Sequence, residues 1–115
     1  MQQSIPTINI KHDMPDVKEA RKRLREELVA AREKGIVAIK IIHGYGSKGV
    51  GGKLKDALRT SLTGMRNRKQ IRHFVHGERF FFYEKVARDA IDLCPALNKD
   101  PDYNKGNEGI TIIIL

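Results

Sequence analysis

The residues best suited to chemistry in this sequence lie in a glycine-rich segment at residues 43–53, which reads HGYGSKGVGGK. Glycines allow backbone N–H groups to approach a phosphate, and a helix that follows adds unpaired donors and the positive end of its dipole. Five glycines within nine positions are costly in chain entropy, which argues against a purely connecting role. We therefore predict a phosphate-binding loop. Its predicted ligands are Gly44, Tyr45, Gly46, Ser47, Lys48, Gly49, Gly51, Gly52 and Lys53.

Two well-known phosphate-binding motifs match this segment incompletely. A Walker A loop requires a hydroxyl residue after its Gly-Lys pair, and here Leu54 follows Lys53. Residues 44–49 match the G-x-G-x-x-G dinucleotide pattern, but the glycines continue to Gly52, so we expect the next helix to begin too late. The sequence is also basic where an acidic residue should hold a ribose. A nucleotide-binding or protein-interaction module is therefore the lesser alternative.

The charge of the chain favours a polyanionic partner. Lys and Arg number 22 against 14 Asp and Glu, which gives a net charge of +8. Each phosphate that a cation neutralises releases condensed counterions, which strengthens binding to nucleic acid, whereas the plain alternative is a solvated basic surface. We expect DNA or RNA as the partner. The residues best placed to follow a phosphate backbone form a basic connector, Arg66, Arg68 and Lys69.

His43 and the aromatic residues each allow two interpretations. His43 could be an acid, a base or a ligand in phosphodiester cleavage, or it could fix the loop through a structural hydrogen bond. Tyr45 could stack on an unpaired base or pack the loop. The aromatic run at 80–83 could also stack bases, although such a run more often belongs to a core or a dimer surface. His73 and His76 have opposite parity on one expected strand, so we predict no histidine metal site.

The elements that would position these residues alternate between strand and helix. Strands are expected at residues 7–11, 36–42, 71–76 and 110–115, with 79–83 extending the sheet. A first helix should begin with Asp13 as its cap and Pro15 in its first turn, a second should follow the glycines, and a third should span 84–94. The nearly continuous apolar runs at 36–42 and 110–115 indicate strands covered on both faces. This order predicts an α/β fold, a two-layer or three-layer β-α-β-α-β-(α)-β sandwich with a mixed, mainly parallel sheet.

Length and composition set the class of protein. A chain of 115 residues suits a single domain over residues 1–115. No apolar run approaches the roughly 20 residues that a membrane-spanning helix needs, and the N-terminus lacks the features of a secretory signal. Cys94 is the only cysteine, which favours a reducing compartment. We expect a cytoplasmic protein that does not bind membranes, with oligomerisation left open.

The glycine-rich segment resembles the signature of the small MutS-related (Smr) domain family. The residues that carry the resemblance are IIHGYG at 41–46, the glycines and lysine of 49–53, and Leu54-Lys55, which together follow the family's HGxG…G…L[RK] pattern. The ending GITIIIL at 109–115 is similar to that family's Gly-hydrophobic-Thr strand. The likeness covers most of residues 4–79 and the last strand, while residues 80–108 look like an insertion with an extra helix.

The resemblance implies a layered domain that binds DNA or RNA, and several members of the family also cleave nucleic acid. In those members the first strand carries an Asp and a His that act with the histidine of the loop. Here Asn9 stands at the acid and Lys11 at the histidine, so that motif is altered. Lys11 could instead bind phosphate, and Asp13 is a weak candidate for a displaced carboxylate partner of His43. An endonuclease, with or without a divalent metal, is therefore the alternative to a nucleic-acid-binding domain.

Overall fold

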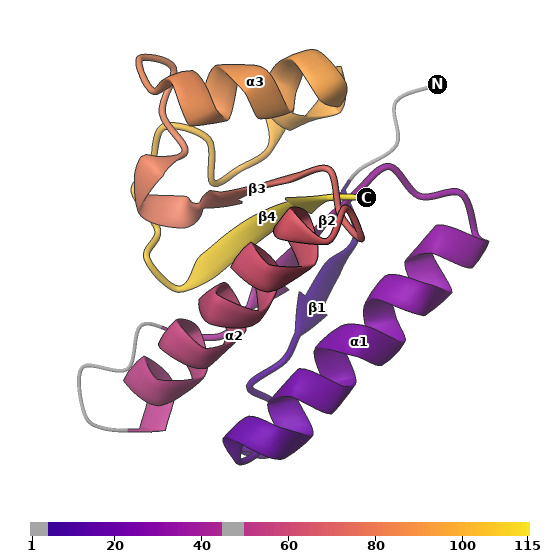
Figure 1. Cartoon of the computed structure of the whole chain (residues 1–115). Coiled ribbons are helices and arrows are strands. Elements are labelled where there is room, and N and C mark those ends of the chain that lie inside the picture. The colour runs from indigo at the N-terminus through magenta and orange to yellow at the C-terminus, as the bar shows by residue number, and fades with distance from the viewer. Residues whose placement is uncertain (1–4, 45–49) are drawn as a thin grey trace.

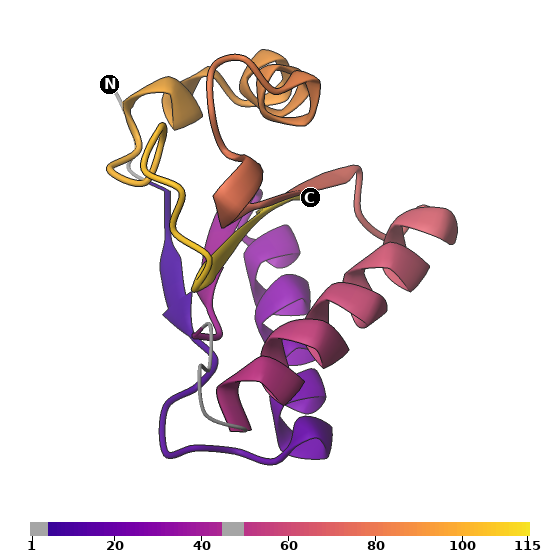
Figure 2. The same cartoon turned by 90° about the vertical axis from the view of Figure 1, so that its left-hand side faces the viewer.

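The computed structural model describes residues 5–44 and 50–115, apart from the side chains of 50–52. Its sheet has the strand order β1-β2-β4-β3, with α1 and α2 on one face and α3 on the other (Figures 1 and 2). In chain order the elements are β1 Thr7–Asn9, α1 Val17–Glu33, β2 Ala38–Ile42, α2 Val50–Asn67, β3 His73–His76, the 3-10 helix η1 Gly77–Arg79, α3 Lys85–Leu93, the 3-10 helix η2 Pro95–Lys99 and β4 Ile110–Ile114. No helix in the described part is long and apolar enough to cross a membrane.

Two apolar cores lie on the two faces of the sheet, which makes the fold a three-layer sandwich. Alternate residues of one strand enter different cores, as Ile39 and Ile41 of β2 pack with α1 and α2, whereas Ala38 packs with α3 and η2. On β4, Ile113 faces α1 and α2, and its neighbours Ile112 and Ile114 face α3. The continuous apolar runs therefore exist because each strand must serve both cores. The expected α/β sandwich is confirmed.

The sheet is mixed, but antiparallel pairing predominates in it, which corrects the expectation of a mainly parallel sheet. β1 and β2 pair in parallel, whereas β4 runs antiparallel to both β2 and β3. Burial on both faces was the observation that suggested parallel strands. Here the burial arises because helices cover both faces of a sheet in which β4 is antiparallel. A continuous apolar run therefore shows that a strand is covered on both faces, but it does not show the direction of the strand.

The residues at the two ends of α1 explain where the helix begins and ends. Asp16 is the N-cap, and its carboxylate accepts a hydrogen bond of 2.8 Å from the Glu19 amide. Asp13 lies upstream with φ +61°, so it is not the cap that the sequence suggested. At the other end, Gly35 adopts φ +70° and Ile36 donates to the Ala31 carbonyl, which closes the helix as a Schellman motif.

Two further expectations about boundaries were wrong. Residues 79–83 do not extend the sheet, because η1 turns the chain away from β3 and buries Phe80 completely beneath α3 and η2. The second helix begins at Val50, so Gly51, Gly52 and Lys53 belong to its first turn and not to a longer loop. The late start of that helix therefore no longer counts against a dinucleotide loop, although the basic sequence further on still does.

A buried ion cluster holds the segment after α3 against the sheet. Lys40 of β2 points into the α3 side, where its ammonium lies 2.9 Å from Asp100 and 2.6 Å from Asp102. Burial alone would lower the pKa of Lys40, but its hydrogen bonds to Asp102 and Asp100 raise it above the ordinary value. A lysine in the middle of an apolar strand thus has a structural role, because it fixes the chain that leads into β4.

Candidate nucleic-acid interface

His43 follows the last residue of β2 and is fully buried. Its Nδ1 lies 2.7 Å from the Gly44 carbonyl, and its Nε2 lies 2.9 Å from the hydroxyl of Thr111 on β4. The Arg59 Nε donates to the same hydroxyl at 3.4 Å, and the Arg59 guanidinium forms a two-pronged pair with Glu78 at 2.7 and 2.8 Å. A continuous chain of hydrogen bonds therefore joins the start of the glycine-rich loop to α2 and η1.

The partners of His43 determine which ring nitrogen carries the proton. The Gly44 carbonyl can only accept, so Nδ1 donates to it and Nε2 of the neutral ring accepts from the Thr111 hydroxyl. Burial lowers the pKa of His43 to about 4; the Gly44 carbonyl opposes this effect, and the charge of Arg59 adds to it. The ring is thus neutral at physiological pH, with both nitrogens already hydrogen-bonded.

The carboxylate in this chain of hydrogen bonds is Glu78, and it pairs with Arg59. Burial alone would raise the pKa of Glu78, but hydrogen bonds from Arg59 lower it to about 2. Asp13 instead lies 3.3 Å from His12 with 76% of its side chain exposed, and no hydrogen bond joins it to His43 among the described residues. The geometry given by residues 5–44 and 50–115 therefore provides His43 with no carboxylate partner.

The altered end of β1 lies beside the start of the loop. The amides of Ile10 and Lys11 donate to the Ile42 carbonyl, and the Asn9 side chain accepts from the Lys11 amide at 3.1 Å. Gly44 has φ +75°, and a Cβ at that position would lie 3.5 Å from Cδ of Lys11. The structure thus brings Lys11 and Gly44 together, as a shared phosphate site requires, around a pocket of about 260 Å³.

Several predicted ligands lie outside the described residues. These are Tyr45, Gly46, Ser47, Lys48 and Gly49. Gly51 and Gly52 are in the first turn of α2, which contains no acidic residue, and Lys53 is exposed there. A helix start without carboxylates suits an anion, because its free amides and dipole carry partial positive charge. The roles of all these residues stay predictions.

The end of α2 and the start of β3 carry a run of exposed cations. Between Asp56 and Glu78 the sequence has no acidic residue and five cationic ones. We call four of them the basic patch; each is exposed and none pairs with a carboxylate in the part of the chain that the structure describes. The basic patch consists of Arg66, Arg68, Lys69 and Arg72.

Lys69 occupies a position that normally favours glycine. It follows the C-terminus of α2 with φ +62°, while Lys69 donates to the Arg66 carbonyl and Gln70 to the Met65 carbonyl. These two bonds are those of a Schellman motif, in which the left-handed residue is usually glycine. A side chain in that conformation costs about 1 kcal/mol, so the basic patch keeps a lysine where a glycine would be more stable.

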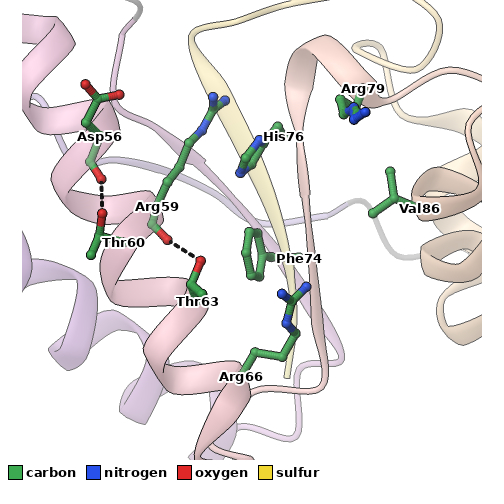
Figure 3. Close-up of a pocket in the computed structure, with 9 residues that line it drawn as sticks. All are labelled: Asp56, Arg59, Thr60, Thr63, Arg66, Phe74, His76, Arg79 and Val86. Carbon is green, nitrogen blue, oxygen red and sulfur yellow. Dashed lines mark hydrogen bonds between the residues drawn. The ribbon is translucent and has the colours of Figure 1, made fainter.

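A groove of about 620 Å³ leads from the basic patch between α2 and the β3–η1 segment (Figure 3). Arg66 lies at one side of it, with its guanidinium 4.6 Å from the centroid of the Phe74 ring. His76 and Arg59 line its middle, and Arg79 lines it near α3. Arg59 and Arg79 are paired with Glu78 and Glu84, so much of the groove's free positive charge comes from Arg66.

The cations Arg66, Arg68 and Lys69 were predicted from the sequence, but the partners that the fold brings to His43 were not. Arg59, Thr111 and Glu78 come from three distant segments, and only the folded chain joins them to His43. One signal was present in the sequence. The sequence has no acidic residue between Asp56 and Glu78, and this observation would have added Arg59 and Arg72 to the predicted basic region.

Comparison with known proteins identifies the family. The family model described as "Smr domain" matches residues 12–79. This chain belongs to the Smr domain family. Members of this family commonly bind nucleic acids, and some have nuclease activity. A search of curated protein sequences found no match.

A solved structure supports the same fold. The crystal structure of the Smr domain of Thermus thermophilus MutS2 is similar over 96% of this chain and 98% of that chain, with a TM-score of 0.59 and 20% identity. At that identity the likeness concerns the fold. Residues 80–108 lie beyond the part that the family model matches.

Within the described residues, no group of three or more His, Cys, Asp or Glu is placed to hold a metal ion.

Proposed function

We propose that this Smr domain binds nucleic acid through the basic patch, the adjoining groove and the cationic loop end formed by Lys11, Gly44 and the first turn of α2. The observation that carries the proposal is the basic patch, because its cations are exposed, unpaired with acids among the described residues, and close together in sequence. Exposed cations in such a cluster gain little from the folded state and much from a polyanion, whose counterions they displace.

The left-handed conformation of Lys69 favours a binding role for the basic patch over a merely solvated surface. A solvated surface gives no reason to hold a lysine in the left-handed conformation, whereas phosphate binding supplies one. The same residue offers a test in which lost binding is separate from lost folding. Lys69→Gly should leave the protein as stable or raise its free energy of unfolding by up to about 1 kcal/mol, and it should weaken binding.

The test is a salt series of affinity for DNA and RNA oligonucleotides, measured by fluorescence anisotropy. We expect a steep negative slope of log affinity against log salt, and a slope smaller by about one unit for each cation removed in Lys69→Gly and Arg68→Ala. Lys22→Ala is the matched control, because it removes an exposed charge from α1. The proposal is wrong if the wild type fails to bind at low salt, or if Lys22→Ala weakens binding as much as Lys69→Gly.

Binding of this kind does not require cleavage by His43. Its buried neutral ring contributes to the loop by holding the Gly44 carbonyl and the Thr111 hydroxyl. The alternative, an endonuclease that uses His43, predicts cleavage that survives repurification and disappears in His43→Ala. If that variant binds nucleic acid normally and only cleavage is lost, the endonuclease interpretation replaces a binding-only function.

A further inference from the structure

Two aromatic rings stand in solvent shortly after η1, whose last residue, Arg79, lines the groove. Phe82 is 64% exposed and Tyr83 is 58% exposed, although both follow the fully buried Phe80. The other Phe and Tyr residues that the structure describes are buried or half-buried. Exposed apolar rings of this size weaken solubility, so a pair of them at one place marks a surface that contacts something.

The backbone holds this aromatic pair in place. The Phe82 amide donates to the Asn104 side chain at 2.8 Å, and Arg88 donates to the Phe82 carbonyl at 3.3 Å. The Tyr83 ring lies 5.4 Å from that of Phe82 at 87° and 5.2 Å from that of Phe81 at 32°. Ring faces that are already ordered lose little freedom when a planar ligand stacks on them.

The aromatic pair is joined to the groove through Arg79. Arg79, which lines the groove, is bonded through Nε at 3.0 Å to Glu84, the residue that follows Tyr83. Lys85 and Arg88 are exposed on the first turn of α3, where Lys85 pairs with Asp89 at 2.8 Å. Arg88 is therefore the cation beside the rings that pairs with no carboxylate among the described residues. Alternating cations and exposed aromatic faces are the features by which proteins hold single strands, since phosphates bind the cations and unpaired bases stack on the rings.

We propose that Phe82 and Tyr83 form a stacking platform for unpaired bases, and that the nucleic acid bound by this domain is single-stranded where it leaves the groove. This inference rests on the proposed nucleic-acid binding and adds the class of substrate. A duplex keeps its bases inside the stack and therefore cannot use the platform, whereas every base of a single strand has a face to offer.

The test compares three probes of equal phosphate number, namely a mixed-sequence single strand, the same strand with abasic sites and a duplex. Phe82→Ala with Tyr83→Ala should weaken binding of the normal single strand about tenfold per stacked base, and leave the abasic strand and the duplex unchanged. Phe82→Leu keeps an apolar side chain without an aromatic face and should weaken binding similarly, whereas Tyr83→Phe should bind as the wild type does.

The outcomes separate this inference from the proposed function. If the wild type binds nucleic acid and the double variant binds the normal strand equally well, the platform is wrong and the proposed function stands. If the variant loses affinity for all three probes alike, the rings have a structural role and the platform is also wrong. If the wild type dimerises in sedimentation and the variant does not, the rings form an interface between copies of the chain. Failure of the wild type to bind any probe overturns both proposals.

Discussion

The buried His43 makes the stability of the protein depend on pH in a defined way. Burial lowers its pKa to about 4 in the folded chain, whereas an unfolded histidine has a pKa near 6.5. The folded state therefore favours the neutral ring, so the stability that His43 contributes is fully present above pH 6.5. It is lost as the pH falls from 6.5 towards 4, because the unfolded chain takes up the proton first.

The size of the effect follows from these two pKa values. Between pH 7.5 and pH 5, proton uptake by the unfolded chain should lower the free energy of unfolding by about 2 kcal/mol, and the full loss near pH 4 approaches about 3 kcal/mol. His76 also has a lowered pKa, mainly through burial, and it contributes in the same direction. A variant without His43 is therefore needed to isolate its share.

The assay is urea unfolding of the wild type and of His43→Gln at pH 7.5 and pH 5. The wild type should lose about 2 kcal/mol more than the variant over this interval. NMR titration of the four histidine rings gives an independent measurement on the unaltered protein, in which the ring of His43 should not titrate above pH 5. A His43 ring that titrates near pH 6.5 in the folded protein would refute the reasoning and would allow an acid–base role near neutral pH.

Three further predictions concern the framework around the site, each measured by urea unfolding. Lys40→Met should destabilise the protein by about 3 kcal/mol, because it leaves two largely buried carboxylates without their cation. Gly77→Ala should cost at least about 2 kcal/mol, since the added Cβ would meet the Asn107 carbonyl oxygen at 1.8 Å and the backbone must shift. Asp16→Ala should cost about 1 kcal/mol through loss of the cap on the Glu19 amide.

Each of these changes has a control within the chain. Lys22→Met removes an exposed lysine and should be nearly neutral, so an equal cost would mean that the ion cluster of Lys40 contributes nothing. At Gly35 a Cβ meets no atom within 4 Å, so alanine there should cost only the strain of φ +70°, less than at Gly77. Asp16→Asn keeps a capping oxygen and should retain most of the stability that alanine loses.

Local patterns were enough to identify the elements and the family. The helical spacing of five residues in the sequence indicates the apolar stripe of α1: Val17, Ala20, Leu24, Leu28 and Ala31. The last four are buried, and Val17 is half-buried against the same core. The HGxG segment between a buried strand and a helix indicated the Smr family, which the family model confirms. These features depend on residues that are close in sequence, so short-range periodicity and motif spacing contain them.

The sequence did not determine strand direction or the environment of His43. Antiparallel β4 is buried on both faces as a parallel strand would be, so its composition could not reveal its direction. Whether His43 is a free base or a buried, neutral hydrogen-bonding group depends on Thr111, Arg59 and Glu78, which come from other segments. The sequence by itself determined which residues carry charge and the order in which most strands and helices follow one another. Only the tertiary structure decided which groups meet and which are removed from water, because long-range contacts set both the partners and the solvation of a side chain.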